Sequence, residues 1–254
     1  MVHARALPGA PEHIEAIESI AGQAAEEARE LESAGFDAII VENMHDAPYV
    51  HGAALGPEIV ASMTRVAVEV AQATEIPLGV QILSGGNRHA LAVAQAAGGL
   101  FIRCENFVFS HVADEGVLAE AEAGALLRYR RTIGASDVAV FADIKKKHAS
   151  HAITADVSIE QTAEAAAFFG ADALIVTGAW TGKPAEEDDL KRARSATDLP
   201  VLVGSGVTAE SAAHLMDVAD GLIVGSAIKR DGGWRNPVDP ARAEALVRSA
   251  KRSG

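Results

Sequence analysis

Short runs of Val, Ile and Leu alternate with longer amphipathic stretches along the whole of this chain. Residues 12–34 carry apolar side chains at helical spacing and stop at Gly35, and the apolar run 36–41 follows at once. An unbroken apolar run bounded by turn residues is typical of a strand that is buried on both faces, as in a parallel sheet. The alternation therefore predicts parallel strands joined by helical crossovers.

Eight strand–helix units can be placed on the sequence. The predicted strands cover residues 1–4, 36–41, 77–83, 100–104, 137–143, 171–177, 200–203 and 220–224. The predicted helices cover residues 12–34, 57–74, 88–97, 117–132, 158–170 and 186–197, with one more after residue 208 and a last one from residue 240. Because parallel strands need right-handed crossovers, this order favours an α/β fold of the closed (β/α)8, or TIM barrel, type with a short first strand.

The length and composition suit a single barrel domain. The chain has 254 residues, close to the ~250 typical of such barrels, and 49% of them are hydrophobic. There is no linker or low-complexity segment, and no Gly-x-Gly-x-x-Gly motif follows the first strand, which disfavours an open dinucleotide-binding sheet. We expect one domain over residues 1–254.

Charge and cysteine content narrow the partners and the compartment. The formal net charge of −13 argues against non-specific binding to nucleic acid or to anionic membranes. No apolar run reaches the ~18 residues of a membrane span, and the sequence does not open like a signal peptide. Cys104 is the single cysteine, which suits a reducing compartment, so we expect a cytoplasmic location. The oligomeric state stays open: Ala-rich helices fit ordinary barrel packing as well as a homo-oligomer.

Two glycine-serine loops near the C-terminus predict an anion site. Gly204, Ser205 and Gly206 follow one apolar run, and Gly225 and Ser226 follow the next. Glycine lets backbone N–H groups approach a ligand, serine adds a hydroxyl, and a helix N-terminus behind such a loop favours negative charge. In a (β/α)8 barrel the loops after strands 7 and 8 often hold phosphate. A phosphorylated small molecule is the expected ligand, with plain tight-turn chemistry as the alternative.

Polar residues directly after the strands are expected to share one rim, where the chemistry of this fold takes place. These candidates are His3, Glu42, Asn43, His45, Asp46, Asn87, Arg103, Glu105, Asn106, Asp143, Lys147, His148, Thr177 and Thr181. Asp143 ends a buried strand, where a carboxylate is costly unless it is paired. Pairing with Lys147 or His148 from its own loop would suit acid/base work, and a structural ion pair is the alternative. We interpret Lys145 and Lys146 as a solvated charge run, and His45, His51, His111 and His151 as solvated loop residues.

A metal site is a weaker alternative. Glu42 and Asp46 could bracket a divalent cation or a sugar hydroxyl, and His3, Glu42 and Asp143 could form a metal site. No helix-spaced His motif supports either arrangement, so we expect no metal, and the sequence requires no cofactor.

Several motifs together resemble the BtpA family, which includes SgcQ-like proteins. They are Met1-Val2-His3, Leu7-Pro8-Gly9, Val41-Glu42-Asn43, Asp46-Ala47-Pro48, Pro77-Leu78-Gly79-Val80, Phe141-Ala142-Asp143, Lys147-His148, the run 171–178 with Thr181-Gly182, both glycine-serine loops, and Asn236-Pro237-Val238-Asp239 with Arg242. The resemblance covers nearly the whole chain. It implies a TIM barrel of the ribulose-phosphate-binding type, with the matching rim residues as its site.

This sequence departs from the family pattern in two places. Residues 84–87 read Ser-Gly-Gly-Asn where the family usually has Arg-Asn-Asp, and Cys104-Glu105 stands where it usually has Val-Asn. Substrate contacts made by the missing Arg and Asp do not carry over.

The resemblance implies two function classes, because one member group is linked to photosystem I biogenesis and another is described in terms of nucleosidase or sugar metabolism. The first hypothesis is an enzyme (a hydrolase, lyase or isomerase) acting on a phosphorylated sugar or a nucleoside- or nucleotide-like compound. In it Asp143, Lys147, His148 and Glu42 are catalytic. The substrate-binding residues are His3, Asn43, Asp46, Asn106, Thr177, Thr181, Gly204, Ser205, Gly206, Gly225 and Ser226. The second hypothesis is a non-catalytic assembly or regulatory factor that keeps the phosphate-binding barrel.

Overall fold

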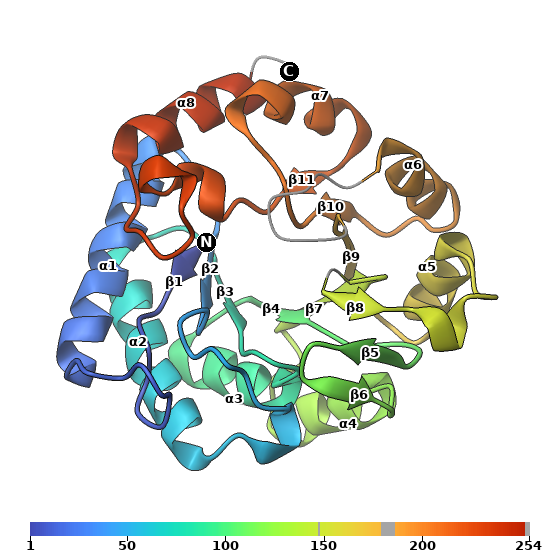
Figure 1. The fold of residues 1–254 in the computed structure, drawn as a ribbon, viewed down its shortest axis with the longest axis horizontal. Helices are drawn as coiled ribbons and strands as arrows, with labels where there is room; N and C mark the ends of the chain where they lie inside the picture. The colour runs from blue at the N-terminus through green and yellow to red at the C-terminus, as the bar shows by residue number, and fades with distance from the viewer. Residues whose placement is uncertain (147, 179–185, 252–254) are drawn as a thin grey trace.

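Eight parallel strands form one curled sheet in the computed structural model, which describes residues 1–146, 148–178 and 186–251 (Figure 1). In spatial order the strands are β1 (Val2–His3), β2 (Ile39–Glu42), β3 (Leu78–Gln81), β4 (Phe101–Cys104), β7 (Ala139–Ile144), β9 (Ala173–Val176), β10 (Val201–Val203) and β11 (Gly221–Leu222). The spatial order follows the chain order, and every recorded pairing between neighbours is parallel. The Met1 amine donates to the Val224 carbonyl at 2.7 Å, which brings the first strand against the last. The predicted barrel with a short first strand is confirmed.

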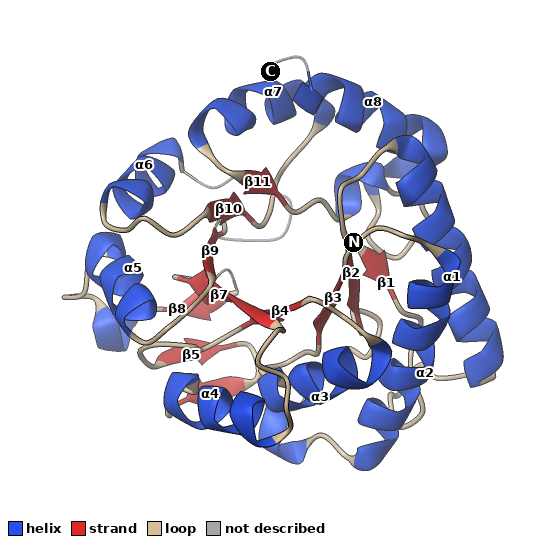
Figure 2. Ribbon diagram, turned by 180° about the vertical axis from the view of Figure 1, so that it is seen from behind, coloured by secondary structure: helices blue, strands red, loops and turns tan. Residues whose placement is uncertain are grey.

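One helix follows each strand and covers the outside of the barrel (Figure 2). The helices are α1 (Ile17–Ala34), α2 (Pro57–Ala73), α3 (Asn87–Ala97), α4 (Ala123–Thr132), α5 (Ile159–Phe168), α6 (Glu187–Ser195), α7 (Ala209–Val218) and α8 (Pro240–Ala250). Local signals set their ends: Gly35 stops α1 in the left-handed conformation, Ser158 and Thr208 form capping boxes, and Asp239 caps α8 in front of Pro240. None of the helices in the described part of the chain is both long and apolar enough to cross a membrane.

Two of the predicted helix starts are wrong. The first helix begins at Ile17 and not at residue 12, since residues 12–16 belong to the loop after Pro11. The stretch predicted as a helix from residue 117 instead opens with strand β6 (Gly116–Leu118), and α4 begins only at Ala123. A non-local pairing decides this: β6 pairs antiparallel with β5 (His111–Ala113), and β5 pairs in turn with β8 (Ala149–Ser150). A three-stranded sheet therefore forms from the start of that predicted helix and from two segments that were assigned to neither a strand nor a helix.

Side chains inside the barrel form two levels. The lower level is apolar: Ile40, Phe101, Ile175 and Ile223 make a cluster of their own, and Phe101 stacks on Phe141 with ring centroids 4.7 Å apart. Because side chains alternate along a strand, the residue two places further along faces the same interior. That rule brings Glu42, Arg103, Asp143 and Gly225 above the cluster. The candidate site therefore lies at the polar level, directly above the apolar cluster inside the barrel.

Candidate functional site

A cavity of about 960 Å³ opens above the polar level. Its wall draws on the carboxyl ends of the strands and on the loops behind them. Of the candidate site residues, those that line it are His3, Glu42, Arg103, Glu105, Asp143, His148, Gly204, Ser205, Gly206, Gly225 and Ser226. Side chains from the ends of several strands therefore meet at one rim of the barrel.

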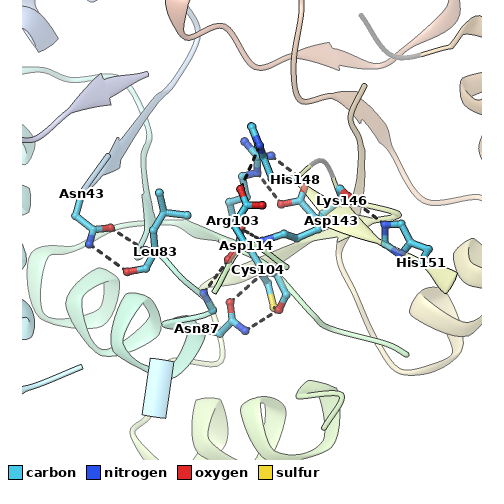
Figure 3. A network of polar contacts seen from close by, with 12 residues as sticks. Asn43, Leu83, Asn87, Arg103, Cys104, Asp114, Asp143, Lys146, His148 and His151 are labelled. Atoms are coloured by element: carbon cyan, nitrogen blue, oxygen red, sulfur yellow. Dashed lines mark hydrogen bonds and ion pairs between the residues drawn. The ribbon is translucent and has the colours of Figure 1, made fainter. Parts of the chain in front are cut away.

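Arg103 and Asp143 form the central ion pair of the site (Figure 3). Arg103 Nε donates to Asp143 Oδ2 at 2.9 Å, and Nη2 donates to Oδ1 at 3.0 Å. Arg103 is paired in register with Phe141, so Asp143 stands two residues further along the neighbouring strand, on the same face. The diagonal brings the planar guanidinium against both carboxylate oxygens, the strongest geometry for such a pair.

This pairing corrects the expectation for Asp143. The sequence suggested Lys147 or His148 from the same loop as its partner, whereas the structure gives Arg103 from β4. Burial acts to lower the pKa of Arg103, but the adjacent Asp143 carboxylate outweighs it and raises that pKa. Both side chains are at least 95% buried, so the carboxylate is held as an ion-pair partner. Lys147 lies outside the described residues.

A second buried ion pair overturns the interpretation of Lys146 as solvated. Lys146 Nζ donates to Glu105 Oε1 at 2.9 Å, and the N–H of Gly85 donates to Glu105 Oε2 at 2.7 Å. Burial opposes both charges, yet their attraction lowers the pKa of Glu105 and raises that of Lys146. Asn87 exchanges two hydrogen bonds with the main chain of Glu105, so Asn87 supports this pair rather than the cavity wall. The two residues meet because Glu105 follows β4 and Lys146 follows β7, and these strands are paired neighbours in the sheet.

Lys145 is also no free surface charge. It donates to the carbonyls of Val157 at 2.7 Å and Thr154 at 3.3 Å, and so it holds the segment before α5. Its ammonium therefore contributes to loop structure, contrary to the expectation of a solvated run.

His3 and Glu42 face each other across the seam between β1 and β2. His3 Nε2 lies 3.8 Å from Glu42 Oε2, and His3 Nδ1 lies 3.0 Å from the Trp234 carbonyl oxygen. Burial lowers the pKa of His3 well below its usual range, so the ring is neutral at neutral pH. Since a carbonyl only accepts, the single proton sits on Nδ1 and leaves the Nε2 lone pair toward Glu42. A neutral imidazole beside a carboxylate can accept a proton or a hydrogen bond from a ligand.

The two glycine-serine loops both line the cavity, and the second of them lies beside His3, because a Cβ at Gly225 would be 3.6 Å from His3 Nε2. Gly206 has a positive φ of 71°, which brings the chain from β10 into the start of α7. The helix cannot use the N–H groups of its own first turn, and the Thr208 hydroxyl satisfies that of Ser211. Arg242, from α8, also lines the cavity here and donates to the Ala227 carbonyl at 2.9 Å. This wall supplies backbone donors, hydroxyls and one guanidinium.

Some predicted binding residues have structural partners outside the cavity wall. Asn43 donates to Asp46 at 2.9 Å and exchanges two hydrogen bonds with Leu83, while Asp46 accepts from the N–H of Leu7 at 2.8 Å. This network ties the first loop to the β2 and β3 loops. Both side chains are satisfied within the protein, so neither is presented to a ligand in this arrangement.

Two further predicted residues, Asn106 and Thr177, do not line the cavity either. Asn106 donates to the Glu120 carbonyl at 2.7 Å and faces a separate small cavity beside Lys146. Thr177 is buried at the end of β9, next to the position of Gly204. Thr181 lies outside the described residues.

Two histidines expected in solvent are buried. His45 packs on the Trp234 ring with centroids 5.1 Å apart, and His111 lies in strand β5 beside His151. Burial lowers the pKa of each of these two rings to about 4. His51 and His151 are half-buried. Loop sequence alone does not reveal burial because the covering segments come from far along the chain.

Several wall residues were not predicted. Gln81, Tyr49, Trp234 and Arg242 all line the cavity. Gln81 ends β3 two residues after Gly79, and strand alternation could have found it. Trp234 belongs to the loop before α8 and has no local signal. Among the described residues there is no cluster of three or more His, Cys, Asp or Glu side chains able to hold a metal, so the alternative built on His3, Glu42 and Asp143 gains no geometric support.

Comparison with known proteins places the chain in a family. The family model described as the BtpA family matches residues 1–252. The chain belongs to the BtpA family. An uncharacterized, mitochondrial-labelled protein of Caenorhabditis elegans is 42% identical over 98% of this chain and 90% of its own length. The photosystem I biogenesis protein BtpA of Synechocystis is 34% identical, over 97% of this chain and 85% of its own length.

Solved structures similar to this BtpA-family chain are TIM-barrel enzymes. Orotidine 5′-phosphate decarboxylase from Pyrococcus horikoshii aligns with a TM-score of 0.60 at 13% identity, over 91% of this chain and 94% of that one. Thiamine phosphate pyrophosphorylase from Pyrococcus furiosus aligns with a TM-score of 0.59 at 16% identity, over 90% of both chains. At such low identity these likenesses establish the fold alone.

Proposed function

We propose that this BtpA-family protein is an enzyme that acts on a phosphorylated sugar or a nucleotide-like small molecule by acid/base chemistry inside the barrel. The observation that carries the proposal is the cavity of about 960 Å³, whose lining includes both glycine-serine loops and buried titratable side chains. A volume of this size suits a small phosphorylated compound. The phosphate-containing names of the structural neighbours are consistent with it.

Each wall of the cavity then has a role. The loops at Gly204–Gly206 and Gly225–Ser226 hold the phosphate, with the first turn of α7 and Arg242 behind them. Next to Gly225, neutral His3 accepts a proton, and the Glu42 carboxylate lies 3.8 Å from His3 Nε2. His148 lines the cavity with its Nδ1 3.5 Å from Asp114 Oδ2, and is placed to act on the outer end of the ligand.

The proposal is tested first by ligand-induced stabilisation. Inorganic phosphate, sugar phosphates and nucleotides are screened by thermal shift, because a ligand that binds only the folded state raises the melting temperature. At a ligand concentration of 100 times Kd the folded state gains about 2.7 kcal/mol of free energy. Hits are then assayed for turnover by ³¹P and ¹H NMR. If no phosphorylated compound stabilises the folded protein, the phosphate site is wrong.

The matched variants are Gly225→Asp and Gly225→Asn. A Cβ at Gly225 meets only the His3 ring, at 3.6 Å, so both side chains fit equally and differ mainly in charge. The carboxylate should abolish phosphate-dependent stabilisation while the amide retains most of it. Gly204 is unsuitable for this purpose, because a Cβ there would lie 2.5 Å from Ile175 Cγ2.

A second candidate function is a non-catalytic role in assembly, which the name of the Synechocystis relative favours. In that case the barrel senses a phosphorylated ligand without converting it. Stabilisation by a phosphorylated compound, with no product formed in the presence of wild-type protein at high concentration, supports this candidate over the enzyme.

A further inference from the structure

Arg103 has donors that the protein itself does not use. A guanidinium carries five N–H groups, and in the described part of the chain only two of them, on Nε and Nη2, find acceptors, both on Asp143. The side chain is 95% buried and lines the cavity. The remaining N–H groups belong to a side chain that lines the cavity, where an oxygen from a ligand or from water can accept from them.

The position of these donors limits which part of a ligand they meet. Gly204 faces the barrel interior at the end of β10, and a Cβ placed there would lie 3.3 Å from Arg103 Nη2. Arg103 thus reaches from β4 across the polar level to the start of the first glycine-serine loop. A phosphate bound at that loop would hold its own next atoms, one to three bonds away, over the guanidinium.

The surrounding charges select the kind of oxygen. Asp143 neutralises Arg103, Glu105 neutralises Lys146, and His3 is neutral. Glu42 adds a carboxylate to the same level. Among the described residues, a second anion would therefore meet no uncompensated cation at this depth, whereas a neutral oxygen with two lone pairs can accept from Arg103 without a charge penalty.

We propose that Arg103 binds the carbonyl oxygen of a phosphorylated aldehyde or ketone, within a few bonds of the phosphate, and that Asp143 is the positioning residue that aims Arg103. This inference rests on the proposed function, since it assumes a phosphate at the glycine-serine loops. It narrows the ligand class to phosphorylated carbonyl compounds. It also changes the role of Asp143, from a proton-transfer group to the carboxylate that fixes the guanidinium plane.

The experiment compares two probes that differ only at the carbonyl. Dihydroxyacetone phosphate has a ketone where glycerol 3-phosphate has an alcohol, and inorganic phosphate reports on the phosphate site alone. Dissociation constants for all three are measured by calorimetry. We expect the ketone to bind wild-type protein about tenfold more tightly than the alcohol, the effect of one charge-assisted hydrogen bond.

The test variant is the double substitution Arg103→Gln with Asp143→Asn, which removes both charges together and leaves no unpaired ion in the interior. It should abolish the preference for the ketone while binding inorganic phosphate within threefold of wild type. Arg103→Lys keeps the positive charge but lacks the planar set of N–H donors, so it should reduce the preference for the ketone. It replaces the double variant as the test if the double variant does not fold. Arg130→Gln removes an Arg–Asp172 pair on the outer surface and should change nothing.

The outcomes separate the two proposals. Phosphate binding with no preference for the ketone, or with the same preference in the variants, overturns the inference and leaves the proposed function standing. Loss of inorganic phosphate binding in a folded double variant overturns it as well, because Arg103 then belongs to the phosphate site. Failure of all three probes to bind folded wild-type protein overturns the proposed function, and the inference falls with it.

Discussion

Lys229 donates to Glu27 at 2.5 Å across 202 residues of sequence, with its own side chain buried from solvent. Glu27, on α1, also accepts from the N–H of Val238 at 3.1 Å. The pair therefore attaches the segment that carries Trp234 to the first helix. Through the Trp234 carbonyl, that segment in turn sets the orientation of His3.

Substituting Glu27 tests this attachment. Glu27→Gln keeps a hydrogen-bond acceptor but leaves a buried ammonium without its counter-charge, so we expect the free energy of unfolding to fall by about 3 kcal/mol in urea titrations. Glu244→Gln, which breaks an exposed pair with Arg248 on α8, is the control and should cost less than ~1 kcal/mol. Equal effects of the two substitutions would show that the buried pair is not specially important.

The buried histidines predict acid sensitivity. Burial lowers the pKa of His45 and of His111 to about 4, whereas an unfolded chain protonates near 6.5. The unfolded state therefore binds more protons between these values, and stability is lost as the pH falls from about 6.5 to about 4. Each ring contributes up to roughly 3 kcal/mol, at 1.36 kcal/mol per pKa unit. Urea unfolding at a series of pH values measures the slope.

Replacing one of the two histidines measures how much that ring contributes to the pH dependence of the free energy of unfolding. His111→Gln should flatten the pH dependence between 6.5 and 4 relative to wild type, with the stability at pH 8 as the reference. A slope that is unchanged in this variant would contradict the assignment to His111.

The protonation of His3 can be observed directly. Because its pKa is lowered by burial and its Nδ1 faces the Trp234 carbonyl, we expect the neutral Nδ1–H form at pH 6. Long-range ¹H–¹⁵N NMR spectra distinguish this tautomer from the Nε2–H form and from the imidazolium, and His3→Asn identifies the signals by their loss. An imidazolium at pH 6 would remove His3 as the proton acceptor.

The barrel floor predicts a steric effect at Gly79. A Cβ there would lie 2.2 Å from Phe101 Cε2, and Phe101 has no free space because it stacks on Phe141. Gly79→Ala should therefore lower the free energy of unfolding by about 1–3 kcal/mol through overpacking. Gly22→Ala, at an exposed position of α1 with no atom within 4 Å of the new Cβ, should instead stabilise by up to ~1 kcal/mol. Thermal and urea unfolding of the two variants check the opposite signs.

The sequence by itself determined the repeating part of this structure. Apolar runs and helical spacing are local patterns, and they predicted the strand and helix order, the stop at Gly35, and the glycine-serine loops after β10 and β11. Because all strands run parallel, the position of a residue at a strand's end was enough to place it on the common rim. His3, Glu42 and Asp143 reached the cavity for that reason.

Only the tertiary structure decided which of these residues touch. Arg103 meets Asp143 because the register of β4 and β7 sets them on a diagonal, and Lys146 meets Glu105 because they follow the ends of the same two strands. Strand β6 exists because β5 is there to pair with it, against the local helical pattern. Ion pairing and burial depend on segments brought together from distant parts of the chain. The periodicity of a single sequence does not reveal the relative register of those segments.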